Sequence, residues 1–236
     1  YEIYRMTTTG TNITRLTTAA GTDEYPVYSP NGSKIVFGSD RDGNQEIYTM
    51  NSDGTGQVRL TNNTFRDSEP AFSPDGTKIV FNRGVNGNFG PWQVFTMNSA
   101  DGSSPLQITS PAQTILDMTP SYSPDGTKII FTRYDTGPFT SVFITVNTDG
   151  SGATTLPLTG FIRKASYSPD GTKIIFTRVG LSGFPDKVEI YPLAGGSTQT
   201  ITDGHNPDWQ PVQPATRRDR FDFDGDGKAD VSVFRP

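Results

Sequence analysis

The chain has 236 residues, a formal net charge of −5 and a pI of about 4.9, and it contains no cysteine. Its length is sufficient for one large or two small domains with a buried core. The negative charge makes nucleic acid or an anionic membrane an unfavourable partner, and the lack of cysteine excludes disulfides, thiolate catalysis and cysteine-bound zinc.

Membrane insertion is not expected, because no stretch approaches the ~18 consecutive apolar residues of a spanning helix. The sequence shows no signal peptide and begins with Tyr1 rather than methionine, so we expect a processed or excised piece of a longer product. Proline, glycine, threonine, asparagine and serine are abundant, and no window of about 12 residues has the apolar spacing of a helix. The composition predicts an all-β chain.

The first predicted elements, in residues 1–17, match the second half of a repeat. YEIYRMTTTGTNITRLT aligns with QEIYTMNSDGTGQVRLT at 45–61, so the chain is predicted to begin at the third strand of a repeating unit. The next unit is complete, with strands predicted at 24–30, 34–40, 45–51 and 57–61. Pro-Asn-Gly and Asp-Gly turns separate these strands, because proline fixes φ and the following residues tolerate positive φ.

A nine-residue motif marks each complete unit. It reads SPNGSKIVF from Ser29, SPDGTKIVF from Ser73, and SPDGTKIIF from Ser123 and from Ser168. Successive copies are separated by 44, 50 and 45 residues. A period of about 40–50 residues built from short strands indicates a β-propeller in which each repeat is one four-stranded blade.

The repeats predict a propeller over residues 1–211, with complete blades at 24–61, 68–109, 118–159 and 163–202 and a further first strand at 206–211. Residues 212–236 are predicted to form a linker, a calcium loop and a terminal strand. Because DGKADVSVFRP is similar to DGTKIVFNR in the repeats, we predict that 231–235 supplies the second strand of a fifth blade. That blade would contain strands from both termini, which removes open sheet edges. The alternatives are a six-bladed propeller and an open ring completed by a neighbour.

The repeated SPDGTKI(V/I)F and the stretch SDRDGNQEIYTMNSDGTGQVRLT resemble the WD40-like repeat of TolB-type propellers. The resemblance implies a β-propeller, a periplasmic, cell-surface or extracellular location in bacteria, and protein–protein interaction without catalysis. Separately, DFDGDGKADVSVFRP resembles the start of an FG-GAP or VCBS-type repeat, which implies a calcium loop followed by a strand.

The spacing of the tail itself also predicts a structural Ca²⁺ site. Its ligands would be the side chains of Asp222, Asp224, Asp226 and Asp230 and the carbonyl of Lys228. Alternate carboxylates can converge on one point, and hard oxygen ligands favour Ca²⁺. Val233 stands where an EF-hand has a bidentate glutamate, so we expect modest affinity. The alternative is a solvated acidic turn without metal.

Two further sets of residues predict binding at the rim of the ring. Three aspartates hold the same place ahead of their first strands and could attract a cation or a basic peptide, unless they only cap turns: Asp23, Asp67 and Asp117. Aromatic residues in the loops between second and third strands could contact protein or glycan, unless they fold back into small loop cores: Trp92, Phe139 and Phe184.

Enzymatic function is not supported by the sequence. His205 is the only histidine, no Gly-x-Ser-x-Gly motif is present, and the glycines fall at hairpin turns rather than ahead of helices. We therefore predict a non-enzymatic module for protein interaction or self-assembly, in which copies of the chain could exchange strands to form an oligomer or filament. The alternatives are the propeller domain of a larger peptidase or hydrolase, and a glycan-binding propeller.

Overall fold

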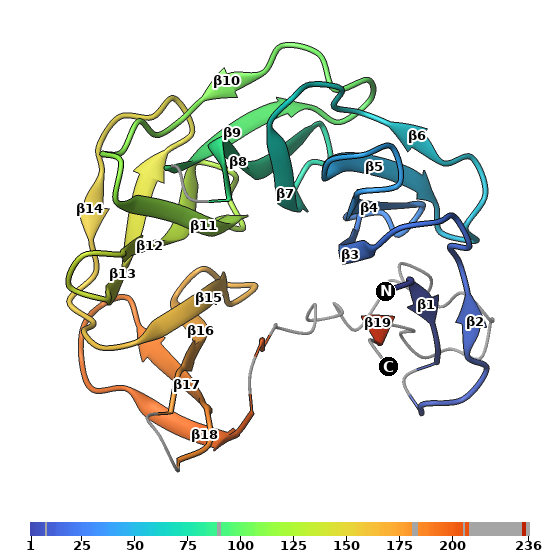
Figure 1. Cartoon of the computed structure of the whole chain (residues 1–236). Helices are drawn as coiled ribbons and strands as arrows, with labels where there is room; N and C mark the ends of the chain where they lie inside the picture. The colour runs from blue at the N-terminus through green and yellow to red at the C-terminus, as the bar shows by residue number, and fades with distance from the viewer. Residues whose placement is uncertain (8, 89–90, 181–183, 205, 208–232, 235–236) are drawn as a thin grey trace.

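The computed structural model describes residues 1–7, 9–88, 91–180, 184–204, 206–207 and 233–234. In this part of the chain every regular element is a β-strand, so the all-β prediction is confirmed. The strands form antiparallel groups that stand around a common centre (Figure 1). The first strand of each complete group is innermost and the fourth is outermost, which is the arrangement of propeller blades.

Four blades contain four strands each. Blade 1 consists of β3 (Asp23–Tyr28), β4 (Lys34–Ser39), β5 (Glu46–Asn51) and β6 (Val58–Arg59). Blade 2 consists of β7 (Arg66–Phe72), β8 (Lys78–Asn88), β9 (Trp92–Asn98) and β10 (Leu106–Gln107). Blade 3 consists of β11 (Ile115–Tyr122), β12 (Lys128–Asp135), β13 (Thr140–Asn147) and β14 (Thr154–Thr155). Blade 4 consists of β15 (Ile162–Tyr167), β16 (Lys173–Arg178), β17 (Lys187–Pro192) and β18 (Gln199–Asp203).

The two ends of the chain meet in one further sheet, which we call the closing blade. Its strands lie in the order β19 (Val233–Phe234), β1 (Tyr4–Arg5) and β2 (Thr14–Arg15). Tyr4 lies opposite Phe234, as Tyr48 lies opposite Phe37 in blade 1. The C-terminal strand thus pairs with the N-terminal strand as the sequence predicts. The strand predicted at 206–211 lies outside the described residues beyond Pro207, so the number of closed blades stays a prediction.

The hydrophobic cores lie between blades rather than within them. At the junction of blades 1 and 2 the cluster consists of Val36, Ile47 and Leu60 from blade 1 and Ile79, Phe81 and Met97 from blade 2. Corresponding positions form the clusters between blades 2 and 3, between blades 3 and 4, and between the closing blade and blade 1. A single blade would expose both of its apolar faces, so each blade depends on its neighbours for stability.

The innermost strands share one unusual backbone position. At this position a residue other than glycine adopts a left-handed conformation, with φ between 50° and 55°: Tyr25, Glu69, Thr119, Lys164 and Asn206. In blades 1 to 4 the pairing register with the second strand shifts at this point. The N–H groups of Lys164 and Asn206 donate to threonine hydroxyls of the preceding blade, at 3.2 and 2.9 Å. Bonds between blades thus help to offset the cost of this conformation, about 1–2 kcal/mol per residue.

In blades 1 to 3, glycine is required at the turn between the third and fourth strands, because this turn approaches the preceding blade closely. A Cβ atom on Gly102 would lie 2.1 Å from the carbonyl oxygen of Leu60. At Gly54 and Gly150 the corresponding distances to the preceding blade are 2.8 and 2.9 Å. Each of these glycines also has a positive φ, which L-residues with a side chain rarely adopt.

Replacing Gly102 by alanine is therefore expected to destabilise the protein more than replacing Gly10. The two glycines have nearly the same φ, +72° and +76°, but a Cβ on Gly10 would meet nothing within 4 Å. Gly10→Ala should cost only the conformational penalty, about 1 kcal/mol, and Gly102→Ala at least ~1 kcal/mol more because two blades must separate. Urea unfolding of both variants measures the difference, and equal losses would contradict the close approach.

Candidate functional site

One face of the ring carries the turns between second and third strands and the connections from each fourth strand to the next blade. These segments emerge together because consecutive strands run antiparallel. Asn44, in a turn of blade 1, donates from Nδ2 to the carbonyl of Asn63 in the connection to blade 2, at 3.1 Å. We call this surface the rim face. The predicted aromatic residues Phe139 and Phe184 lie on it and are 61% and 74% exposed.

Trp92 lies at the start of a strand rather than in the loop where the sequence predicts it. It is the first residue of β9, is half-buried, and pairs in parallel with Leu116 of blade 3. The guanidinium of Arg66 lies 5.9 Å from the centroid of its indole ring. Trp92 therefore joins blades 2 and 3, whereas Phe139 and Phe184 project into solvent.

Two exposed aromatic residues of the rim face were missed by the sequence analysis. Phe65 and Phe161 lie in the connections that lead into blades 2 and 4, and they are 38% and 37% exposed. Phe161 contacts Tyr134 with ring centroids 6.5 Å apart, and Phe65 lies 5.8 Å from the guanidinium carbon of Arg83. The sequence did contain a signal for these two residues. Each is a large apolar residue in the loop just ahead of a first strand, and solvent-exposed loops are usually polar.

The three aspartates that were predicted to attract a cation or a basic peptide are buried. Asp23, Asp67 and Asp117 are only 3%, 0% and 0% exposed. Each is ion-paired with an arginine of its own blade, in the pairs Asp23–Arg41 (2.9 Å), Asp67–Arg83 (2.6 Å) and Asp117–Arg133 (2.7 Å). The latter two pairs are bidentate. Buried and neutralised carboxylates offer no free charge to a cation or a basic peptide, so that prediction was wrong.

The arginine of each pair also covers a core phenylalanine. The guanidinium carbons of Arg41, Arg83 and Arg133 lie 5.4–5.6 Å from the centroids of second-strand rings, in the pairs with Phe37, Phe81 and Phe131. This geometry adds a cation–π attraction to the ion pair. The acid, the arginine and the ring therefore form one structural unit at the rim side of each blade.

Blade 4 keeps this unit with a different acid. Ile162 occupies the place of the aspartate, and Arg178 instead binds both carboxylate oxygens of Glu189, at 2.9 and 3.0 Å. Glu189 lies opposite Phe176 in the register, where the other blades have Tyr48, Phe95 and Ile144. Arg178 also lies 5.6 Å from the Phe176 centroid. The third strand of blade 4 thus supplies the acid that its first strand lacks.

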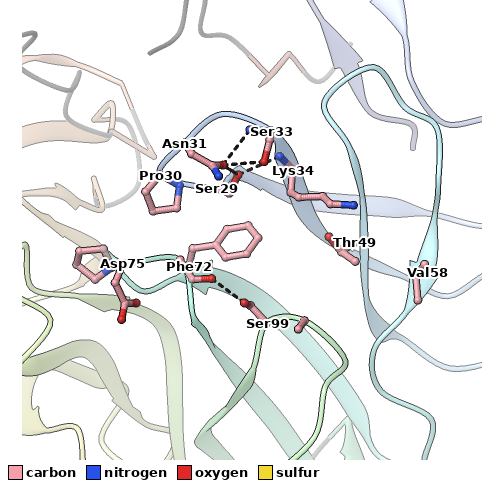
Figure 2. A pocket seen from close by; sticks show the side chains of 13 residues that line it. Ser29, Pro30, Asn31, Ser33, Lys34, Thr49, Val58, Phe72, Asp75 and Ser99 are labelled. Carbon is pink, nitrogen blue, oxygen red and sulfur yellow. Dashed lines mark hydrogen bonds between the residues drawn. The ribbon is translucent and has the colours of Figure 1, made fainter. Parts of the chain in front are cut away.

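The opposite face of the ring has grooves between blades. The groove between blades 1 and 2 has a volume of about 520 Å³, and the ring of Phe72 lies between Asn31 and Ser99 in it (Figure 2). An equivalent groove between blades 3 and 4 has a volume of about 550 Å³ and contains Tyr167 at the place of Phe72. Both grooves are bordered by the repeated Ser-Pro-Asn/Asp-Gly turns.

Polar groups in the first groove are largely engaged within the protein. Asn31 Oδ1 accepts hydrogen bonds from Ser29 and Ser33, and Lys34 Nζ donates to Asn51 at 2.8 Å. Hydrogen bonds from Ser73 and Thr77 hold the pKa of Asp75 below its usual value. The aspartate of this groove therefore stabilises the turn.

The predicted calcium ligands Asp222, Asp224, Asp226, Lys228 and Asp230 lie outside the described residues. Among the residues that are described, no three histidine, aspartate or glutamate side chains are grouped so that they could hold a metal ion. The same part of the chain contains no helix long and apolar enough to span a membrane.

Replacing Asp117 by asparagine is expected to lower the free energy of unfolding by about 3 kcal/mol, because the change leaves Arg133 without its buried counter-charge. Asp149→Asn is the matched control, since Asp149 lies in an exposed turn where it accepts hydrogen bonds from Ser151. Urea unfolding should show a loss for the control of less than about 1 kcal/mol. Equal losses for the two variants would contradict a structural role for the buried pair.

Comparisons with known proteins agree with the propeller arrangement of the blades. Residues 1–170 match the family model of the TolB beta propeller domain, and no curated protein matches the chain. TolB from Acinetobacter baumannii has a similar fold, with a TM-score of 0.70 at 21% identity over 86% of this chain and 52% of that one. A protein of Agrobacterium tumefaciens described as TolB has a TM-score of 0.59 at 18% identity, over 86% and 88% of the two chains. A puromycin-hydrolyzing peptidase of Mycobacterium tuberculosis has a TM-score of 0.58 at 13% identity, over 78% and 31%.

The chain spans about half the length of Acinetobacter TolB, and identities at this level show a common fold. The family model, by contrast, matches well over half of the sequence, including the first three copies of the Ser-Pro-Asn/Asp-Gly motif. On this basis, the chain belongs to the TolB beta-propeller domain family.

Proposed function

We propose that this chain is a non-enzymatic binding module of the bacterial periplasm or cell surface, and that its rim face docks a protein partner. The observation that carries the proposal is the exposure of Phe139 and Phe184 on that face, with Phe65 and Phe161 on the same side. These residues come from three different blades, so they offer separated anchors rather than one loop cluster.

Exposed phenylalanines suit protein recognition for a physical reason. Each buries a large apolar area when it is covered, and few rotatable bonds are immobilised. Aromatic anchors surrounded by polar residues are the usual centres of binding energy in interfaces. Around them the rim face carries ion pairs such as Arg163–Asp186 (2.7 Å), which could form a polar border.

A catalytic role for the rim face has little support. Buried acids there are occupied by arginines, as in the pairs of Asp67 and Asp117, and Glu189 is held by Arg178. The second candidate is the propeller of a larger hydrolase, which the fold similarity to the Mycobacterium peptidase favours. In that case the catalytic groups would belong to another part of the protein.

A photoreactive phenylalanine analogue at position 139 or 184 is expected to crosslink to the same partner in the cells that produce the protein. The matched control is position 58, because Val58 is 52% exposed but lies on an outer strand. Phe184→Ser should reduce crosslinking from position 139 about tenfold, the effect of losing about 1.4 kcal/mol of binding energy. Identical products from positions 139 and 58, or none from 139 and 184, would contradict docking at the rim face.

We also propose that the tail binds a structural Ca²⁺ ion through Asp222, Asp224, Asp226 and Asp230 and the carbonyl of Lys228. The support is the alternation of carboxylates around glycine in the sequence. Because the loop directly precedes β19, an ordered loop would hold that strand against β1. Without the cation, the close carboxylates would repel one another and favour an extended tail.

Calcium is therefore expected to raise the melting temperature and a chelator to reverse the effect. At a free Ca²⁺ concentration of 100 times Kd the stabilisation should be about 2.7 kcal/mol. The Asp224→Asn/Asp226→Asn variant should not respond, whereas Asp149→Asn, which alters an exposed turn elsewhere, should respond like the unaltered protein. A melting temperature that is independent of calcium in all three proteins would show that the tail is an acidic turn.

A further inference from the structure

The carboxylate of Glu69 is enclosed by the protein but has no arginine partner. In the described part of the chain, each buried acid forms an ion pair with an arginine: Asp23, Glu46, Asp67, Asp117 and Glu189. Glu69 is half-buried as a residue, and protein atoms surround its carboxylate, which pairs with no arginine or lysine of this part. A buried charge without a partner is costly, so this site holds an acid whose charge is poorly compensated.

Hydrogen bonds of Glu69 join blades 2 and 3. Glu69 lies on β7 at the left-handed position of blade 2, and Thr119 holds the same position on β11 of blade 3. The N–H of Thr119 donates to Glu69 Oε2 at 2.7 Å, and Nδ2 of Asn82 on β8 donates to the same oxygen at 2.6 Å. One carboxylate oxygen therefore supports the strained residue of the next blade.

Later junctions use a neutral acceptor for the corresponding bond. The left-handed residues of blade 4 and of the last repeat donate to the hydroxyls of Thr132 and Thr177, at 3.2 and 2.9 Å. These threonines directly follow the core phenylalanine of their second strands, and Asn82 stands at that place in blade 2. Because Asn82 donates, the acceptor there is Glu69. Among the described bonds of this kind, only the one between blades 2 and 3 therefore ends on an ionisable group.

Asn82 also carries an oxygen without a donor. It is 1% exposed, and its Oδ1 is buried with no hydrogen-bond partner among the described residues. Rotation of the amide by 180° would turn this oxygen toward Glu69, and 2.6 Å is a usual length for an O–H···O bond. Only a protonated Glu69 can donate that hydrogen. The arrangement of the two side chains therefore favours the neutral acid.

Nearby charges leave this preference in place. Burial is the main cause that raises the pKa of Glu69, the two hydrogen bonds and Lys164 on β15 lower it, and Glu24 on β3 raises it further. Lysines of β4 and β8 donate to asparagines elsewhere, and Arg66 of β7 donates to Gln45. The acids on and around β7 are occupied in their own ion pairs: Asp23–Arg41, Glu46–Arg59, Asp67–Arg83 and Asp117–Arg133.

We propose that Glu69 is a pH-sensitive latch between blades 2 and 3, which takes up a proton in mildly acidic surroundings and makes the junction more stable in its neutral form. The proton binds a carboxylate oxygen and is donated to Asn82 Oδ1, while the N–H of Thr119 stays bonded to the carboxyl group. Strand β11 also pairs with β9 through Leu116 and Trp92, so the latch acts where the two blades share one sheet. It does not depend on the function proposed for the rim face.

Glu69→Gln tests the latch, because glutamine keeps the accepting oxygen and cannot titrate. An acid whose pKa is raised by folding contributes stability that is complete below its unfolded pKa, about 4.3, and is lost as the pH rises through its folded pKa. The melting temperature of the unaltered protein should therefore fall relative to that of Glu69→Gln as the pH is raised from about 4.5 to about 7.5. A difference between the two proteins that is independent of pH would overturn the proposal.

Thr177→Val is the matched control, because it removes the neutral acceptor of the same kind of bond on blade 4. Its loss of melting temperature relative to the unaltered protein should be the same at every pH. A pH-dependent loss like that expected for Glu69→Gln would assign the effect to the ring as a whole and would count against Glu69.

NMR of the unaltered protein supplies a readout that needs no folded variant. The Glu69 carboxyl carbon should titrate above the value of about 4.3 found for glutamate in peptides, and the Thr119 amide proton should shift with the same midpoint. In Asn82→Thr a hydroxyl can accept from Thr119, as on blades 3 and 4, so the amide should no longer follow the titration. A Glu69 signal with an ordinary midpoint, or a Thr119 amide that does not follow it in the unaltered protein, would contradict the latch.

Discussion

Burial of apolar side chains between neighbouring blades is the interaction on which this fold depends. Each blade is a small twisted sheet with two apolar faces, and neither face can be covered from within the blade. Second strands are therefore almost continuously apolar, as in Ile35, Val36 and Phe37, because they have a neighbour on both sides. The turn glycines of blades 1 to 3 serve the same contact, since only a residue without Cβ permits the approach of one blade to the carbonyl groups of the preceding blade.

Charged groups lie around these apolar junctions and do not replace the apolar side chains within them. The aspartate–arginine pairs hold buried acids at the rim side of blades 1 to 3, and the arginines spread over the same phenylalanines that form the cores. In blade 4 the arginine is retained while the acid moves from position 162 to Glu189. The arginine is thus the fixed element, because it must cover Phe176, whereas its counter-charge can come from either adjacent strand.

Features that repeat in the chain could be predicted from the sequence, and features that depend on a neighbour could not. The strand order, the turns and the meeting of the two termini follow from motifs such as the one at Ser73, because turn chemistry and alignment are local. The ion pair of Asp117 could not be predicted, since it requires knowing which side chain the second strand places opposite it.

Differences between repeats therefore carry more functional information than their similarities. Among the described residues, most positions that recur from blade to blade are accounted for by turns, cores and ion pairs. The exposed Phe139 and Phe184 lie in loops that vary in length and sequence between blades, where no structural demand fixes the residue. Large apolar residues exposed in such varied loops are the positions at which the proposed protein partner would bury apolar surface.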